Sequence, residues 1–211
     1  MRTSKILIVT IALITWAAVI LQLYLAIENR VESISESIIR FFSYFTILTN
    51  TLVAICFTCL FLFPKSSIGK FFSKSSTLAA VTAYIFLVGI GYQLLLRQTW
   101  HPEGLQKLVD ELLHSVIPVL VLIYWFAYAP KNNLKWKYVF TWLIFPAVYL
   151  AYMLVRGAMA GFYPYPFVRV NELGYEKVLL NCLLIGVGFV LTFVVTIAYG
   201  RRKNKIQSQK T

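Results

Sequence analysis

Two side chains in separate apolar segments could together perform acyl-transfer chemistry. Thr46 lies in FFSYFTILTN (residues 41–50), and His114 lies in ELLHSVIPVLVLIYW (residues 111–125). A threonine hydroxyl is a weak nucleophile until a base such as an imidazole lies within hydrogen-bond reach. The same residues also fit a structural role, because a threonine can bond its own helix backbone and a histidine can join two helices.

Polar residues at helical spacing accompany this pair. Asp110 precedes His114 by four residues, so its carboxylate could hold the imidazole in one tautomer. Pro118 follows His114 by four residues and leaves the His114 carbonyl without its usual helical partner. Asn50 shares a helix face with Thr46, where it could donate to an oxyanion or simply join two helices.

The composition indicates an integral membrane protein. The chain has 211 residues, of which 59% are hydrophobic and 13% charged, and its mean hydropathy is +0.73. The net charge of +12 would suggest nucleic acid as a partner for a soluble protein. Here the bases flank apolar segments, so we expect the membrane to be the partner and nucleic acid not to be.

Six apolar segments are long enough to cross a bilayer, which needs about 20 residues per helix. We expect an all-α, six-helix membrane bundle that forms one domain over residues 1–211. The first segment is too long for the core of a signal peptide and is interpreted as a retained span. The expected spans are residues 6–27, 41–63, 77–96, 109–129, 138–155 and 178–198.

The charges divide between the two ends of this bundle. The termini, the second-to-third loop and the fourth-to-fifth loop hold 13 of the 20 bases, Arg2 and Lys210 included, and no acid. All eight acids fall in the other loops or beside them. The positive-inside rule therefore predicts that both termini are cytoplasmic. The compact form favours the plasma membrane of a bacterium.

Polar side chains from five spans are expected at one level, in the outer third of the bilayer. They are Gln22, Thr46, Gln93, His114 and Asn181. An unpaired polar group in hydrocarbon costs several kcal/mol. We therefore expect these five side chains to share a cavity that opens toward the outer face. Gln93 is a second candidate oxyanion donor, and Asn181 a supporting residue.

The last outer loop contains GFYPYPF (residues 161–167), in which aromatic residues alternate with prolines. Tyr163 and Tyr165 could belong to a lid over the cavity or to an ordinary interfacial anchor. Arg156, at the outer end of span five, could hold a carboxylate or snorkel to the head groups. Phe45 is expected beside a substrate chain.

The motifs YFTILTN, HSVIPVLVL and GFYPYPF, with six spans and short loops, resemble the androgen-induced-protein family, in its prokaryotic branch. This family includes the androgen-dependent protein that regulates tissue factor pathway inhibitor. Its animal members are threonine hydrolases that split fatty acid esters of hydroxy fatty acids. The resemblance implies that Thr46 is the nucleophile and that His114 is the essential histidine. It also implies that Tyr165-Pro166-Phe167 matches the family's aromatic–Pro–Phe pattern before the last span. The animal pattern has no acid at the position of Asp110.

The expected function is therefore hydrolysis of a lipid ester taken from the bilayer, without a metal or a cofactor. Cys56 and Cys59 form a CxxC motif inside an apolar segment, where small packing residues explain them better than a metal site. Two alternatives remain open: a lipid-binding protein without chemistry, and a transporter. The absence of charged relays and repeats disfavours the transporter.

Overall fold

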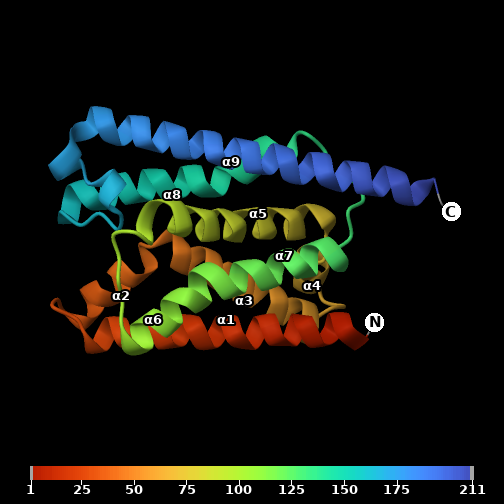
Figure 1. Cartoon of the computed structure of the whole chain (residues 1–211), viewed down its shortest axis with the longest axis horizontal. Helices are drawn as coiled ribbons and strands as arrows, with labels where there is room; N and C mark the ends of the chain where they lie inside the picture. The colour runs from red at the N-terminus through yellow and green to blue at the C-terminus, as the bar shows by residue number, and fades with distance from the viewer. Residues whose placement is uncertain (1, 210–211) are drawn as a thin grey trace.

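The structure, a computed structural model, describes residues 2–209, in which the regular elements are helices joined by turns and loops. Six of the described helices are long and apolar enough to span a membrane: Thr3–Glu28, Phe45–Leu62, Ser75–Leu96, Gly104–Ala127, Tyr138–Ala160 and Val170–Ile206. The protein is thus an integral, multi-pass membrane protein. Figure 1 shows the six helices running roughly parallel along one long axis.

The elements follow the chain in this order: α1 (Arg2–Glu28), α2 (Ile34–Phe42), α3 (Phe45–Leu62), α4 (Ser67–Phe72), α5 (Ser75–Gly91), the π-helix η1 (Tyr92–Leu96), α6 (Gly104–Glu111), the π-helix η2 (Leu112–Val116), α7 (Ile117–Ala127), α8 (Tyr138–Ala160), the 3-10 turn η3 (Pro166–Val168) and α9 (Val170–Ser208). α6, η2 and α7 together form the fourth span. α2 and α4 are short helices outside the spans.

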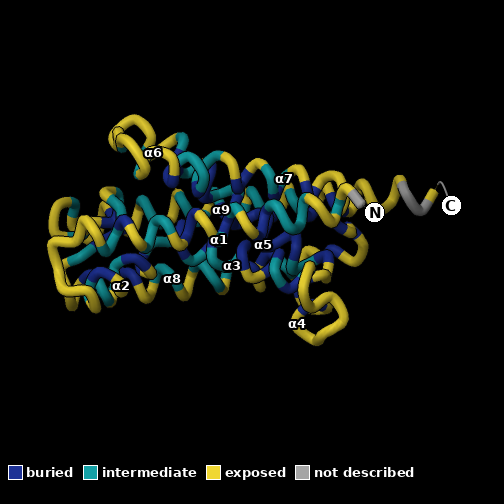
Figure 2. Tube along the Cα trace, turned by 90° about the horizontal axis from the view of Figure 1, so that it is seen from below, coloured by how far each residue is buried: buried dark blue, intermediate teal, exposed yellow. Residues whose placement is uncertain are grey.

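The bundle has two parts. α1, α3, α5 and α7 pack on one another and share the main core, and α8 and α9 form a hairpin whose α9 contacts α5. Large aromatic side chains fill the space between α8 and the other four helices. The ring centroid of Phe145 lies 5.3 Å from that of Phe45 and 5.1 Å from that of Tyr84. Figure 2 shows the buried residues along the middle of the bundle, and the exposed ones at its ends and on its outer faces.

The second span begins four residues later than the expected boundary at residue 41. α2 ends at Phe42, Ser43 turns the chain with its hydroxyl on the carbonyl of Ile39, and α3 begins at Phe45. α2 is amphipathic, with Glu36 and Arg40 on it, and cannot continue as an apolar span. The break places Thr46 in the first turn of α3.

The helix that carries His114 is locally widened. Residues Leu112–Val116 form a π-helix, and Pro118 follows in the first turn of α7. Such single-turn π segments are frequent at functional sites. Gly89 of α5 makes room for this segment, since a Cβ there would lie 3.1 Å from the carbonyl oxygen of His114 and 3.1 Å from Pro118 Cβ.

Both described ends of the chain lie at the same end of the bundle, opposite α2 and α6 (Figure 1). α9 is longer than the expected span 178–198 at both ends, and it contains a break at Gly174, whose φ of 75° suits glycine. Lys210, which belongs to the basic tail, lies outside the described residues.

Candidate functional site

Thr46 and His114 meet across the bundle. The Thr46 hydroxyl oxygen lies 3.3 Å from His114 Nε2, although 68 residues separate the two in the sequence. Thr46 is delivered by the first turn of α3, and His114 by the π segment η2. The distance is at the long end of a hydrogen bond and leaves the base within reach of the hydroxyl proton.

The surroundings of His114 select its tautomer. Nδ1 lies 2.9 Å from the main-chain oxygen of Asp110 and 3.3 Å from Asp110 Oδ1. A carbonyl oxygen can only accept, so Nδ1 carries the proton and donates it. In the neutral ring, Nε2 is then the unprotonated nitrogen, and it faces Thr46. The expectation that Asp110 contacts the imidazole is met, and its backbone contributes the shorter of the two contacts.

Tyr92 holds the imidazole from the side. Its ring stacks on His114 with centroids 4.2 Å apart and an interplanar angle of 18°. The Tyr92 side chain also contacts Asp110, whose residue is 6% exposed. Tyr92 is not among the site residues predicted from the sequence. Its signal would have been an aromatic residue one position before Gln93, at the level proposed for the polar layer.

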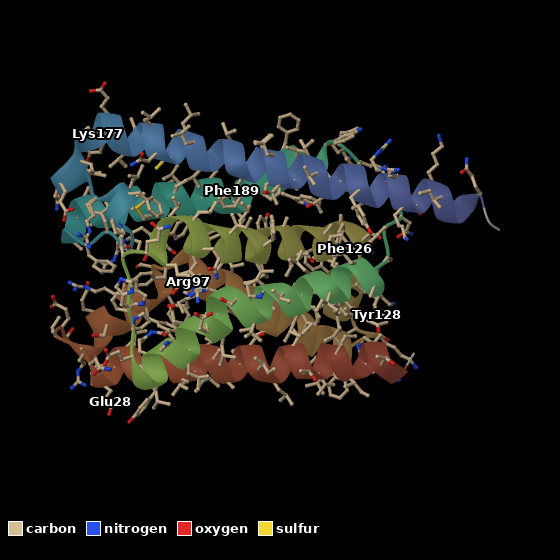
Figure 3. The ribbon with its side chains drawn as sticks, in the orientation of Figure 1. Glu28, Arg97, Phe126, Tyr128, Lys177 and Phe189 are labelled. Atoms are coloured by element: carbon tan, nitrogen blue, oxygen red, sulfur yellow. The ribbon has the colours of Figure 1, made fainter. Side chains whose placement is uncertain are left out.

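A cavity of about 650 Å³ adjoins the pair. Thr46, His114 and Phe45 line it together with residues of α5, η1, α8, η3 and α9. Its wall is apolar except for a few groups gathered near Thr46. Phe189 lines it from α9, and Arg97 directly follows η1 (Figure 3).

The cavity reaches the lipid-facing surface between α5 and α9. Three residues line the cavity and are also exposed: Ile90 (41%) and Leu94 (70%) on one side, and Leu184 (62%) on the other. Gly91, Gly186 and Gly188 also line it, and a Cβ at any of them would meet nothing within 4 Å. The opening is thus lateral, between two membrane helices.

Two expected oxyanion donors are occupied elsewhere. The Asn50 amide donates to the carbonyl oxygens of Thr46 (2.9 Å) and Leu113 (3.3 Å), so it joins α3 to the His114 segment. The Gln93 amide donates to the Ser115 hydroxyl at 3.1 Å. Asn50 therefore positions the two catalytic candidates relative to each other. Gln22, which the polar-layer argument also included, accepts from Gln106 of α6.

The aromatic loop is fixed over the site. Tyr165 and Phe45 line the cavity, whereas the Tyr163 ring packs where a Cβ of Gly157 would otherwise lie, 2.0 Å from Tyr163 Cε1. The Asn181 amide donates to the Phe167 carbonyl at 2.8 Å and so ties the loop to α9. Asn181 thus fixes the loop to α9, and Tyr163 packs it against α8.

Arg156 is already paired. It lies 2.5 Å from Glu36 Oε1, and the same carboxylate accepts from Arg40 Nε at 2.9 Å. Arg156 does not appear among the residues that line the cavity. It links α8 to α2 through Glu36, and an interpretation as a residue that binds a substrate carboxylate gains no support from this position.

Comparisons with models of protein families, with curated proteins and with solved structures found no match.

Proposed function

We propose that the protein is an intramembrane threonine hydrolase that cleaves a lipid ester. The observation that carries this proposal is the contact of the Thr46 hydroxyl with the unprotonated nitrogen of His114, at 3.3 Å, on the wall of an apolar cavity. The resemblance to the androgen-induced-protein family supports the same two residues and suggests fatty acid esters of hydroxy fatty acids as the substrate type.

The cavity supports a lipid rather than a water-soluble ester. Its volume of about 650 Å³ is in the range of sites that enclose a small lipid-sized ligand. The lateral opening between α5 and α9 allows acyl chains to enter directly from the bilayer. The nucleophile lies where the few polar groups of the cavity gather, so the ester would bind there with its chains in the apolar remainder.

The reaction would proceed in two acyl-transfer steps. His114 Nε2 takes the Thr46 proton as the hydroxyl oxygen forms a bond to the ester carbonyl carbon, and the carbonyl electron pair moves onto its oxygen. On collapse, the bond to the leaving alcohol breaks and His114 returns the proton to that alcohol. Water then attacks the acyl-threonine by the same route and releases the acid.

The decisive experiment measures ester hydrolysis by the purified protein in detergent, with labelling by an activated fluorophosphonate. Thr46→Ala and His114→Ala should each abolish turnover and labelling, and Thr46→Ser should retain both because it keeps a hydroxyl. Thr49→Ala is the matched control, since Thr49 is equally buried in α3 but does not line the cavity.

Retention of turnover by both Thr46→Ala and His114→Ala would refute the assignment. A wild-type protein that binds lipid esters without hydrolysing them, and a Thr46→Ala variant that binds them equally well, would instead support a binding protein without chemistry.

A further inference from the structure

The site needs a donor for the negative charge that develops on the carbonyl oxygen. Removing one such donor from a hydrolase typically lowers kcat by about 10²–10³. The candidates from the sequence, Asn50 and Gln93, spend their amide protons on main-chain carbonyls and on Ser115. Among the residues that line the cavity, none is a lysine or an arginine. The remaining strong donors on its wall are tyrosine hydroxyls.

Three tyrosines line the cavity, and they differ in what surrounds their hydroxyls. The Tyr149 hydroxyl donates to the main-chain oxygen of Ser43 at 3.0 Å. The Tyr92 hydroxyl lies on the side of the Asp110 carboxylate, and its ring stacks on His114. Tyr165 differs, because its oxygen accepts from the main-chain N–H of Thr46 at 3.3 Å, so its hydroxyl lies at the nucleophile itself.

Tyr165 thus lies beside both the backbone and the side chain of Thr46. Its oxygen is within hydrogen-bond reach of the Thr46 nitrogen, and its side chain interacts with that of Thr46. Thr46 occupies the first turn of α3, whose N-terminus has no side-chain cap. The Thr46 N–H is taken up by the Tyr165 oxygen, and the dipole of α3 favours negative charge at this N-terminus.

The position of Tyr165 is fixed by its neighbours. Its ring stacks on Phe167 with centroids 5.2 Å apart and an interplanar angle of 5°, and it meets the edge of Tyr44 at 5.7 Å. Pro164 and Pro166 flank it and restrict the backbone of the loop. Burial raises the pKa of Tyr165, so the hydroxyl keeps its proton at neutral pH.

We infer that Tyr165 is a third catalytic residue, whose hydroxyl donates to the oxyanion formed when Thr46 attacks the ester. This inference rests on the proposed function. The hydroxyl forms no covalent bond and transfers no proton. It stabilises the negative charge while the bond from Thr46 forms and while the bond to the leaving alcohol breaks.

Tyr165→Phe tests this inference, because it removes the hydroxyl and keeps the ring that stacks on Phe167. We expect kcat to fall about 100-fold or more with KM little changed. Tyr152→Phe is the control: its hydroxyl bonds Ser43 at 2.9 Å, next to α3, but it does not line the cavity. It should hydrolyse the ester at the wild-type rate.

A pair of inhibitors supplies a second measurement. A trifluoromethyl ketone analogue of the lipid can form an oxyanion adduct with Thr46, whereas the matching ether analogue cannot. Tyr165→Phe should weaken binding of the ketone about as much as it lowers kcat and should leave binding of the ether unchanged.

Two results would overturn the role of Tyr165: near-wild-type kcat in Tyr165→Phe, or equal losses of ketone and ether binding, which would indicate a structural role only. Failure of the proposed function looks different, because then Thr46→Ala and His114→Ala would also retain wild-type behaviour.

Discussion

Asp110 offers His114 two acceptors for the same N–H, one from its backbone and one from its side chain. The backbone oxygen is the nearer, at 2.9 Å against 3.3 Å for Oδ1. The backbone contact follows from the helix itself, since residues four apart are neighbours on it. The tautomer of His114 therefore does not depend on the carboxylate alone, and the carboxylate adds stabilisation when the ring becomes positively charged.

If the protein hydrolyses esters as proposed, Asp110→Asn should lower turnover without abolishing it. A hydrogen bond to a charged group contributes about 1.5–3 kcal/mol, so kcat should fall about ten- to a hundredfold while the backbone acceptor keeps the ring oriented. Glu111→Gln is the control, because its carboxylate bonds Arg97 and Ser115 instead. A loss as deep as that of His114→Ala would contradict this division between backbone and carboxylate.

Elements differ in how far the sequence determines them. The six spans could be predicted because apolar length is a property of the segment itself. Pro118 predicted that the His114 carbonyl lacks its usual helical partner, but not that the segment forms a π-helix. The break between Phe42 and Phe45 could not, because Ser43 and Tyr44 interrupt an aromatic run without a charge, a glycine or a proline. Hydropathy reads such a run as one helix. Yet this break puts Thr46 in the first turn of α3.

The candidate site, too, could be predicted only in part. Thr46 and His114 could be paired from their levels in the bilayer, since depth follows from position along a helix. The occupied amides of Asn50 and Gln93 and the contact of Tyr165 with Thr46 depend on side chains that meet across the bundle. The Tyr165 contact joins residues 119 positions apart, and no local spacing indicates it.

The α8–loop junction depends on a close approach at Gly157. A Cβ there would lie 2.0 Å from the Tyr163 ring, so Gly157→Ala must displace Tyr163 and with it the segment that carries Tyr165. We expect a loss of about 1–3 kcal/mol in the free energy of unfolding, typical of overpacking, and reduced turnover. Thermal unfolding in detergent and an ester assay measure the two effects.

Gly186→Ala provides the comparison for stability. It introduces the same methyl group into a membrane helix, but nothing lies within 4 Å of the added Cβ. Its unfolding temperature should equal or exceed that of the wild type, because alanine favours the helix more than glycine does. Equal unfolding temperatures for Gly157→Ala and Gly186→Ala would show that Tyr163 is not held as the structure indicates.

The whole molecule separates a well-packed group of four helices from a hairpin held away by aromatic rings. α8 and α9 are the least buried spans, and the cavity lies along their junction with α5 and α3. This arrangement explains how a membrane protein of 211 residues can contain a sizeable cavity. It also places Thr46 and His114 toward the end that carries α2 and α6, so the orientation of the bundle decides which leaflet supplies the substrate.

The charge distribution predicts that this end faces outward. Among the described residues, 12 of the bases lie in the segments at the end with the termini, while all eight acids lie toward the end with α2 and α6. A cysteine-free background, with Cys56, Cys59 and Cys182 replaced, allows single cysteines to report the orientation. Val31→Cys, at a site 92% exposed beside α2, should react with a membrane-impermeant maleimide on intact cells.

Lys65→Cys, at an exposed site in the loop before α4, should react only after the cells are lysed. The pair is internally controlled, because both positions lie in loops just outside a span. The reverse pattern would place the termini outside and would make the cytoplasmic leaflet the source of the ester. The positive-inside rule gives that outcome no support, since it would move a face with 13 bases and no acid across the membrane.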